Sequence, residues 1–131
     1  MKIIPYNSSY MFFIKLYDNF NNLYKLKPGE LINFGIKENK DIYLNKKYTI
    51  FKRIGNSNFI ENEGYLVYLM PEETKFKKDK YYYDIGLRYI QDNVEKYRFL
   101  QKSEKILVEK TVTRNEEDDE EEEEEDFNAE P

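Results

Sequence analysis

Residues 80–90 read KYYYDIGLRYI, and this stretch decides the fold class. Every second residue from Tyr81 to Tyr89 is aromatic or aliphatic, whereas the positions between them include Asp84 and Arg88. Alternation with a period of two is typical of a β-strand that buries one face and leaves the other in water. The stretch therefore predicts a long amphipathic strand.

Other segments repeat this kind of pattern. Residues 10–17 (YMFFIKLY) and 31–37 (LINFGIK) alternate, and residues 65–70 (YLVYLM) are apolar on both faces, as expected of a central strand. Shorter strand candidates are residues 23–26, 46–54, 94–99 and 105–112. Short strands without intervening helices predict an all-β fold, a single antiparallel β-sandwich of about seven strands.

Residues 92–110 leave an alternative open. Val94, Tyr97 and Gln101, together with many Lys and Glu residues, also suit an amphipathic helix. Turn chemistry is clearer elsewhere, because Asn and Asp clusters follow residue 17 and residue 90, and Gly55-Asn56-Ser57-Asn58 marks a loop. We expect strands in residues 92–110, with the helix as the second interpretation.

The charge divides the chain into two parts. Residues 116–131 hold 12 of the 26 acidic residues and no Lys or Arg, so residues 1–115 carry 14 acids against 21 bases, a net charge of +7. A block of like charges repels itself and buries nothing. We therefore expect a β-sandwich domain over residues 1–115 and a disordered polyacidic tail over residues 116–131.

The tail has three interpretations: a solubilising appendage, a guard that folds back on the basic domain, or a contact for a basic partner. The residues that would act in it are the acids and the single aromatic: Glu116, Glu117, Asp118, Asp119, Glu120, Asp126 and Phe127.

Catalysis is not expected. Cys and His are both absent, which excludes a thiolate or imidazole metal site, a Cys nucleophile and a His general base. No phosphate-binding Gly-rich motif is present. Asp84 is the best acid–base candidate, but a cross-strand ion pair or a bond to backbone is the more frequent role for such a residue. Glu61 and Glu63 match no calcium loop. We predict a non-enzymatic protein without cofactors.

No apolar run is long enough to cross a bilayer. We therefore expect that the protein does not associate with a membrane and that it is synthesised in the cytoplasm.

One stretch resembles a known pattern. Residues 63–74 (EGYLVYLMPEET) followed by residues 77–87 (KKDKYYYDIGL) resemble a G-x-Y-x-x-x-L-x-P-x-D-T…G-x-Y-x-Y-D-I pattern of small tailed-phage proteins. These proteins are similar to the immunoglobulin-like N-terminal domain of phage upper baseplate proteins. Here Glu73 and Asp79 replace the usual Asp and Gly. The resemblance implies an Ig-like sandwich that is a virion component or a small phage-encoded accessory domain, and it offers no catalytic residues. The partners that we expect are other phage structural proteins, with a homo-oligomer as a further option.

Pro71 and Thr74 within this stretch also have a local meaning. Proline ends a strand, and a threonine hydroxyl caps a turn, so a structural corner is the simpler interpretation.

Single-stranded DNA is the alternative partner. Basic residues interleaved with aromatic rings suit a groove that holds phosphates and stacks bases, and a polyacidic tail would compete for such a groove. The residues predicted to contact a partner or nucleic acid are Lys75, Lys77, Lys78, Lys80, Tyr81 and Tyr82.

Overall fold

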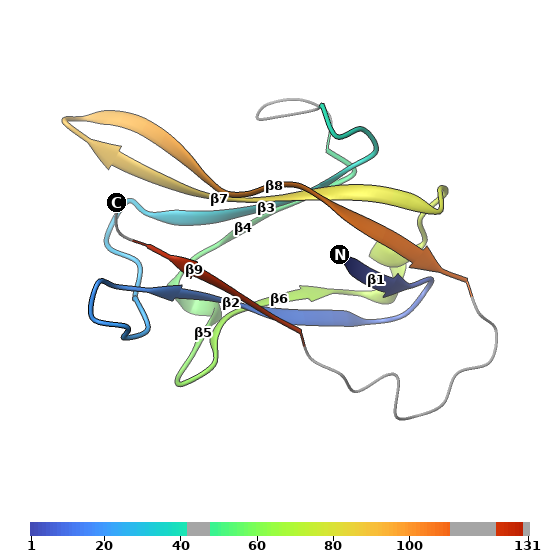
Figure 1. The fold of residues 1–131 in the computed structure, drawn as a ribbon, viewed down its shortest axis with the longest axis horizontal. Helices are drawn as coiled ribbons and strands as arrows, with labels where there is room; N and C mark the ends of the chain where they lie inside the picture. The colour runs from blue at the N-terminus through green and yellow to red at the C-terminus, as the bar shows by residue number, and fades with distance from the viewer. Residues whose placement is uncertain (42–47, 111–122, 130–131) are drawn as a thin grey trace.

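The computed structural model describes residues 1–41, 48–110 and 123–129. Within these residues the strands form two sheets, which lie as two layers in Figure 1. Sheet A has the order β1-β8-β7-β3-β4, and sheet B has the order β5-β6-β2-β9. The strands are β1 (Lys2–Pro5), β2 (Tyr10–Tyr17), β3 (Leu31–Lys37), β4 (Ile50–Ile54), β5 (Phe59–Ile60), β6 (Gly64–Leu69), β7 (Lys80–Gln91), β8 (Val94–Glu109) and β9 (Glu123–Asn128).

The hydrophobic core lies between the two sheets and is supplied by the alternating positions. In β2, Phe12, Ile14 and Leu16 have no exposed surface, and Ile32 and Ile36 of β3 are equally buried. Both strands begin and end where the alternation predicts. The all-β class is thus confirmed, with two sheets around one core.

The expected strand over residues 80–90 is β7, and it forms a hairpin with β8. Asp92 and Asn93 make the two-residue turn, with φ of 54° and 63°, as a tight hairpin turn requires. The helix alternative for residues 92–110 is wrong, and the two short strands expected there are one long strand, β8. Ser103, with φ of 49°, lies close to register shifts in this pair.

The pairing is not purely antiparallel, which corrects the predicted fold class. β1 pairs with β8 in parallel, and β9 pairs with β2 in parallel. The sequence patterns also missed β1, β5 and β9, so the described residues hold more strands than expected. The strand expected at residues 23–26 is reduced to one bridge between Tyr17 and Leu23. Residues 46–47 of another candidate lie outside the described residues.

The prediction of a disordered tail is wrong for residues 123–128, because they form β9 along the edge of β2. Figure 1 shows this red strand in the lower layer, beside the blue β2. Residues 116–122, including Glu116, Glu117, Asp118, Asp119 and Glu120, lie outside the described residues.

The corner after β6 is a 3₁₀ turn, Pro71–Thr74. The Thr74 hydroxyl donates to the carbonyls of Ser8 and Pro71 and accepts the Ser8 N–H at 2.8 Å. This confirms the structural role predicted for Pro71 and Thr74. The helical segments of the described residues are this turn and a second 3₁₀ turn at Asn56–Asn58, neither of which has the length or apolar character to cross a bilayer.

Candidate interaction site

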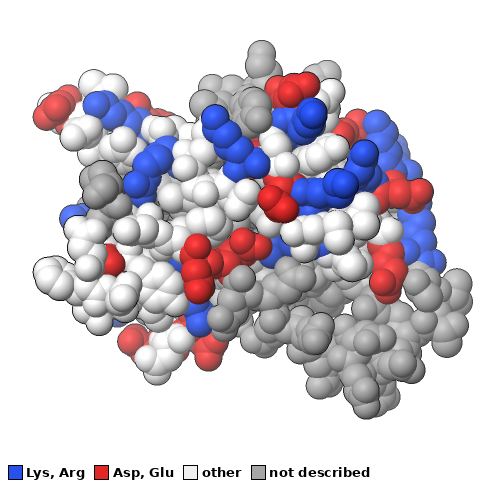
Figure 2. Space-filling model, in the orientation of Figure 1, with Lys and Arg blue, Asp and Glu red and all other residues white. Residues whose placement is uncertain are grey.

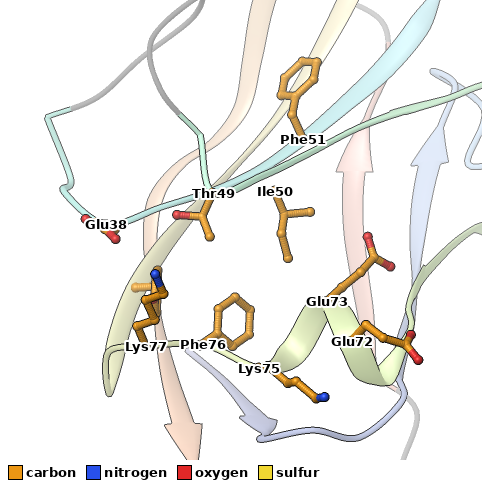
Figure 3. A pocket seen from close by; sticks show the side chains of 10 residues that line it. Glu38, Thr49, Ile50, Phe51, Glu72, Glu73, Lys75, Phe76 and Lys77 are labelled. Atoms are coloured by element: carbon orange, nitrogen blue, oxygen red, sulfur yellow. The ribbon is translucent and has the colours of Figure 1, made fainter.

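Three of the six predicted contact residues line one cavity, and the others do not. Lys75, Lys77 and Tyr81 line a cavity of about 550 Å³, which lies between β4 and the Pro71–Thr74 turn. Figure 3 shows Ile50 and the Phe76 ring facing each other across it, with Glu38 and Lys77 on one side and Glu72 and Glu73 on the other. The lining is thus apolar in the middle and of mixed charge at the rim.

Two of the acidic residues that line this cavity are paired with neighbouring lysines. The ammonium of Lys52 lies 3.0 Å from the carboxylate of Glu73, and the ammonium of Lys78 lies 3.1 Å from the carboxylate of Glu38. Burial would raise the pKa of Glu73, but hydrogen bonds from the Met70 N–H and the Lys52 ammonium outweigh it and hold that pKa below its usual value. Glu38 and Glu73 of the cavity lining are therefore neutralised by lysines.

The three predicted side chains of β7 have different roles. Tyr81 is buried, its ring centre lies 4.7 Å from that of Phe76, and its hydroxyl accepts the Lys78 N–H. It therefore belongs to the core and cannot stack on a base. Tyr82 lies on the outer face of sheet A. Its neighbours there are the exposed Lys80, two residues earlier in β7, and Lys105, which is the register partner of Tyr82 in β8.

Lysine side chains dominate this end of the molecule. Figure 2 shows them gathered near the start of β7 and the end of β8, with acidic groups among them. Lys110 there lies 3.3 Å from Asp79, and its ammonium also lies over the ring of Tyr6.

The structure also shows a second site, which the sequence patterns did not predict. Lys2 of β1 is only 1% exposed, and its ammonium lies 2.9 Å from the carboxylate of Glu125 in β9. The same carboxylate accepts a hydrogen bond from Tyr83 at 3.0 Å, and the Lys2 ammonium lies 3.8 Å from the ring centre of Phe12. A charged group of the tail thus reaches into the space between the sheets.

The end of the described tail is fixed as well. The Arg98 guanidinium donates to the carbonyls of Asn128 and Ala129, at 3.1 and 2.9 Å. The Ala129 N–H donates to the carbonyl of Tyr17, and Phe127 packs against the core. Asp126 is exposed and lies opposite Lys15 in the register. We call Lys2, Tyr83, Arg98 and the edge of β2 the tail-docking site.

β9 and the Pro71–Thr74 turn beside the cavity lie at different positions along β2, although Lys2 pairs with Ile106, which is also the register partner of Tyr81. The register places β9 beside residues 12–17, whereas Ser8, just before β2, bonds to Thr74 next to Lys75. The described part of the tail therefore does not cover the predicted lysine cluster.

Asp84 is a buried carboxylate that accepts several hydrogen bonds. It accepts both a charge-assisted bond from Lys37 at 2.8 Å and bonds from the Tyr48 hydroxyl and the Ser103 N–H. Lys37 is fully buried and Asp84 is 2% exposed. This confirms the expected cross-strand and backbone role. Arg88, on the same strand, bonds to the Gly29 carbonyl and Glu95 instead.

Tyr97 covers Asp84 and its surroundings on the outer face of sheet A. Its ring lies over the Gly86 backbone, so that a Cβ built at Gly86 would lie 2.0 Å from the hydroxyl. Burial raises the pKa of Tyr97 to about 12; the nearby Asp84 charge adds to this shift, and a hydrogen bond with Asn33 opposes it. The cluster joins β3, β7 and β8 and leaves no carboxylate oxygen of Asp84 without a donor.

No metal-binding group of three or more acidic side chains occurs in the part of the chain that the structure describes. No protein-family model matches the chain, and no curated protein and no solved structure matches it either.

Proposed function

We propose that this chain is a non-enzymatic interaction module that assembles with other proteins through the outer face of sheet B. Met11 and Tyr68 lie opposite each other in the register of β2 and β6, and Met70 follows β6. These three side chains are 37%, 43% and 51% exposed. The outer face of such a sheet is usually polar, and adjoining exposed apolar side chains are typical of contact surfaces.

The resemblance of residues 63–87 to tailed-phage proteins supports the setting that we propose. In that setting the fold is an Ig-like sandwich, the partners are other phage structural proteins, and the module is made in the host cytoplasm and resides in the virion. Methionine suits such a surface because its flexible thioether adapts to irregular partners.

Incorporation into particles tests this proposal. Mass spectrometry of purified phage particles should find the protein at a fixed copy number, and Met11→Glu should lower that number because it places a charge in the contact. Phe20→Glu is the matched control, since Phe20 is 84% exposed in the turn after β2 and lies outside this face. Consistent absence from particles, or equal loss with both variants, would reject the proposal.

Single-stranded DNA remains a second proposal, and Tyr82 supports it. An exposed sheet face with a tyrosine between Lys80 and Lys105 provides a stacking ring with cations on both sides. The acidic tail would then regulate access to this surface through its charge.

Oligonucleotide binding by the full chain at low salt tests the second proposal. Removal of residues after 115 would also delete β9, so internal substitutions are the cleaner probe. Replacing Lys80 and Lys105 by Ala should weaken binding and reduce the salt slope by about 1.4, which is about 0.7 for each phosphate contact on a single strand. Lys25→Ala should change neither the affinity nor the slope much. If the intact protein ignores oligonucleotides at low salt, this second proposal fails.

A further inference from the structure

β9 is held by anchors more than by its own strand preference. Its sequence is EEEDFN, and Asp, Glu and Asn are all depleted in strands. Neighbouring acidic groups also repel one another. The segment nevertheless pairs with β2 over residues 12–17. Contacts with the rest of the protein must therefore supply the stabilisation.

Two anchors supply it. The first is Glu125, whose carboxylate bonds to the buried ammonium of Lys2 and to the Tyr83 hydroxyl. A carboxylate that bonds to a desolvated cation contributes more than an exposed pair does. The second is the end of the strand, where Arg98 binds two successive carbonyls and Phe127 packs on the core. Together they recognise an acid and an aromatic residue two positions apart in an extended backbone.

Most of the buried core comes from residues outside β9. Among the residues whose burial the structure describes, Ala129 is the buried core residue from the C-terminal segment, and the others lie between Ile4 and Val108. The segment thus lies on the edge of β2 as a peptide ligand does in β-strand addition, where backbone bonds give affinity and side-chain pockets give specificity.

We propose that the tail-docking site also accepts β9 of a second copy of this chain, so that copies associate by exchanging C-terminal strands. The exchanged strand would make every contact seen here, with Lys2, Tyr83 and Arg98 on one copy and Glu125 and Phe127 on the other. Exchange of an identical element is a low-cost route to association, because no new interface has to be built.

The connection between β8 and β9 limits how far apart two exchanging copies can lie. Residues 110–122 connect β8 to β9, and a fully extended segment of that length spans at most about 45 Å. The strand of the same copy competes through its high effective concentration. Weakening the protein's own strand must therefore favour a strand added from outside.

A peptide competition experiment tests the proposal. The probe is a fluorescent peptide of residues 122–131, EEEEDFNAEP, and the receptor is the full chain carrying Glu125→Gln and Phe127→Ala. Fluorescence anisotropy should show the variant binding this peptide at least about tenfold more tightly than the wild-type chain does, because its own strand competes less. A peptide with the same residues in scrambled order should not bind.

Native mass spectrometry supplies the second measurement, since it needs only the wild-type fold. A mixture of isotope-labelled and unlabelled wild-type chains should form mixed oligomers as concentration rises, and Arg98→Ala should reduce them, whereas Arg53→Ala, an exposed arginine on β4, should not. Failure of a folded double variant to bind the peptide, equal binding of the scrambled peptide, or a wild-type chain that stays monomeric would overturn the proposal.

Discussion

The ammonium of Lys2 and the carboxylate of Glu125 lie 2.9 Å apart, although the two residues come from opposite ends of the chain. Lys2 belongs to the edge strand of sheet A and Glu125 to the edge strand of sheet B. The pair therefore connects the two layers along one side of the sandwich, and it makes part of the acidic segment a component of the fold.

Glu125→Gln should lower the free energy of unfolding by about 1–3 kcal/mol, because it removes a negative charge beside a buried cation, while the partial exposure of Glu125 limits the loss. Chemical denaturation monitored by circular dichroism measures this change. Glu61→Gln is the control, since its pair with Lys25 is long and exposed, and it should stay within about 0.5 kcal/mol. Equal effects of the two substitutions would contradict the role of Glu125.

Asp84→Asn should lower the free energy of unfolding by about 3–5 kcal/mol, because it leaves the fully buried Lys37 ammonium beside a neutral amide. Urea titrations of the variant and the wild-type protein provide the comparison. Asp92→Asn in the hairpin turn should be nearly neutral, since Asn tolerates the positive φ found there. If Asp84→Asn unfolds at the same urea concentration as the wild-type protein, the cluster around Asp84 does not stabilise the sheet.

Gly86→Ala should destabilise the protein by about 1–3 kcal/mol, because the added methyl group collides with the Tyr97 hydroxyl. Thermal unfolding detects this change. Gly55→Ala is the matched comparison, because its Cβ would meet only the end of the Leu31 side chain at 3.3 Å and its φ is negative. A midpoint shift that is as large for Gly55→Ala would refute the packing of Tyr97 over Gly86.

Tyr97 should make stability fall at alkaline pH. Its folded-state pKa of about 12 lies above the ordinary value of 10.0, so the protonated form is favoured by folding. That contribution is complete below pH 10 and is lost as the pH rises from 10 towards 12. Denaturation at stepped pH should therefore show a decline in this window that is smaller in Tyr97→Phe. If stability falls as much in Tyr97→Phe as in the wild-type protein between pH 10 and 12, groups other than Tyr97 cause the fall.

The local patterns predicted β2, β3 and β7 well, because each strand has apolar side chains at alternate positions that face the core. Part of the opposite face of each strand is buried as well, which the alternation did not predict. The same alternation places Tyr81 inward and Tyr82 outward, so it already separates a core ring from a surface ring. β8 was predicted in two pieces because its middle residues, Leu100 and Gln101, are both only partly buried and give no clear alternation.

The tail-docking site could not be predicted from local sequence. An acidic run indicates disorder on composition, and only the distant Lys2 and Arg98 reverse that expectation. Nothing near Lys2 in the sequence signals a buried ammonium, although Lys2, Ile4 and Pro5 are all buried and Ile3 is exposed once β1 pairs with β8. The bridging of two chain ends is a property of the topology and not of either segment.

Amide hydrogen exchange of Ala129, measured by NMR, tests most directly the claim that the C-terminal segment is part of the fold. Its N–H donates to the Tyr17 carbonyl at 2.8 Å, and the residue is buried. We predict exchange that is slow relative to an unstructured peptide of the same sequence and that becomes faster in Glu125→Gln. Exchange of Ala129 at the rate of the free peptide in the wild-type protein would contradict the account.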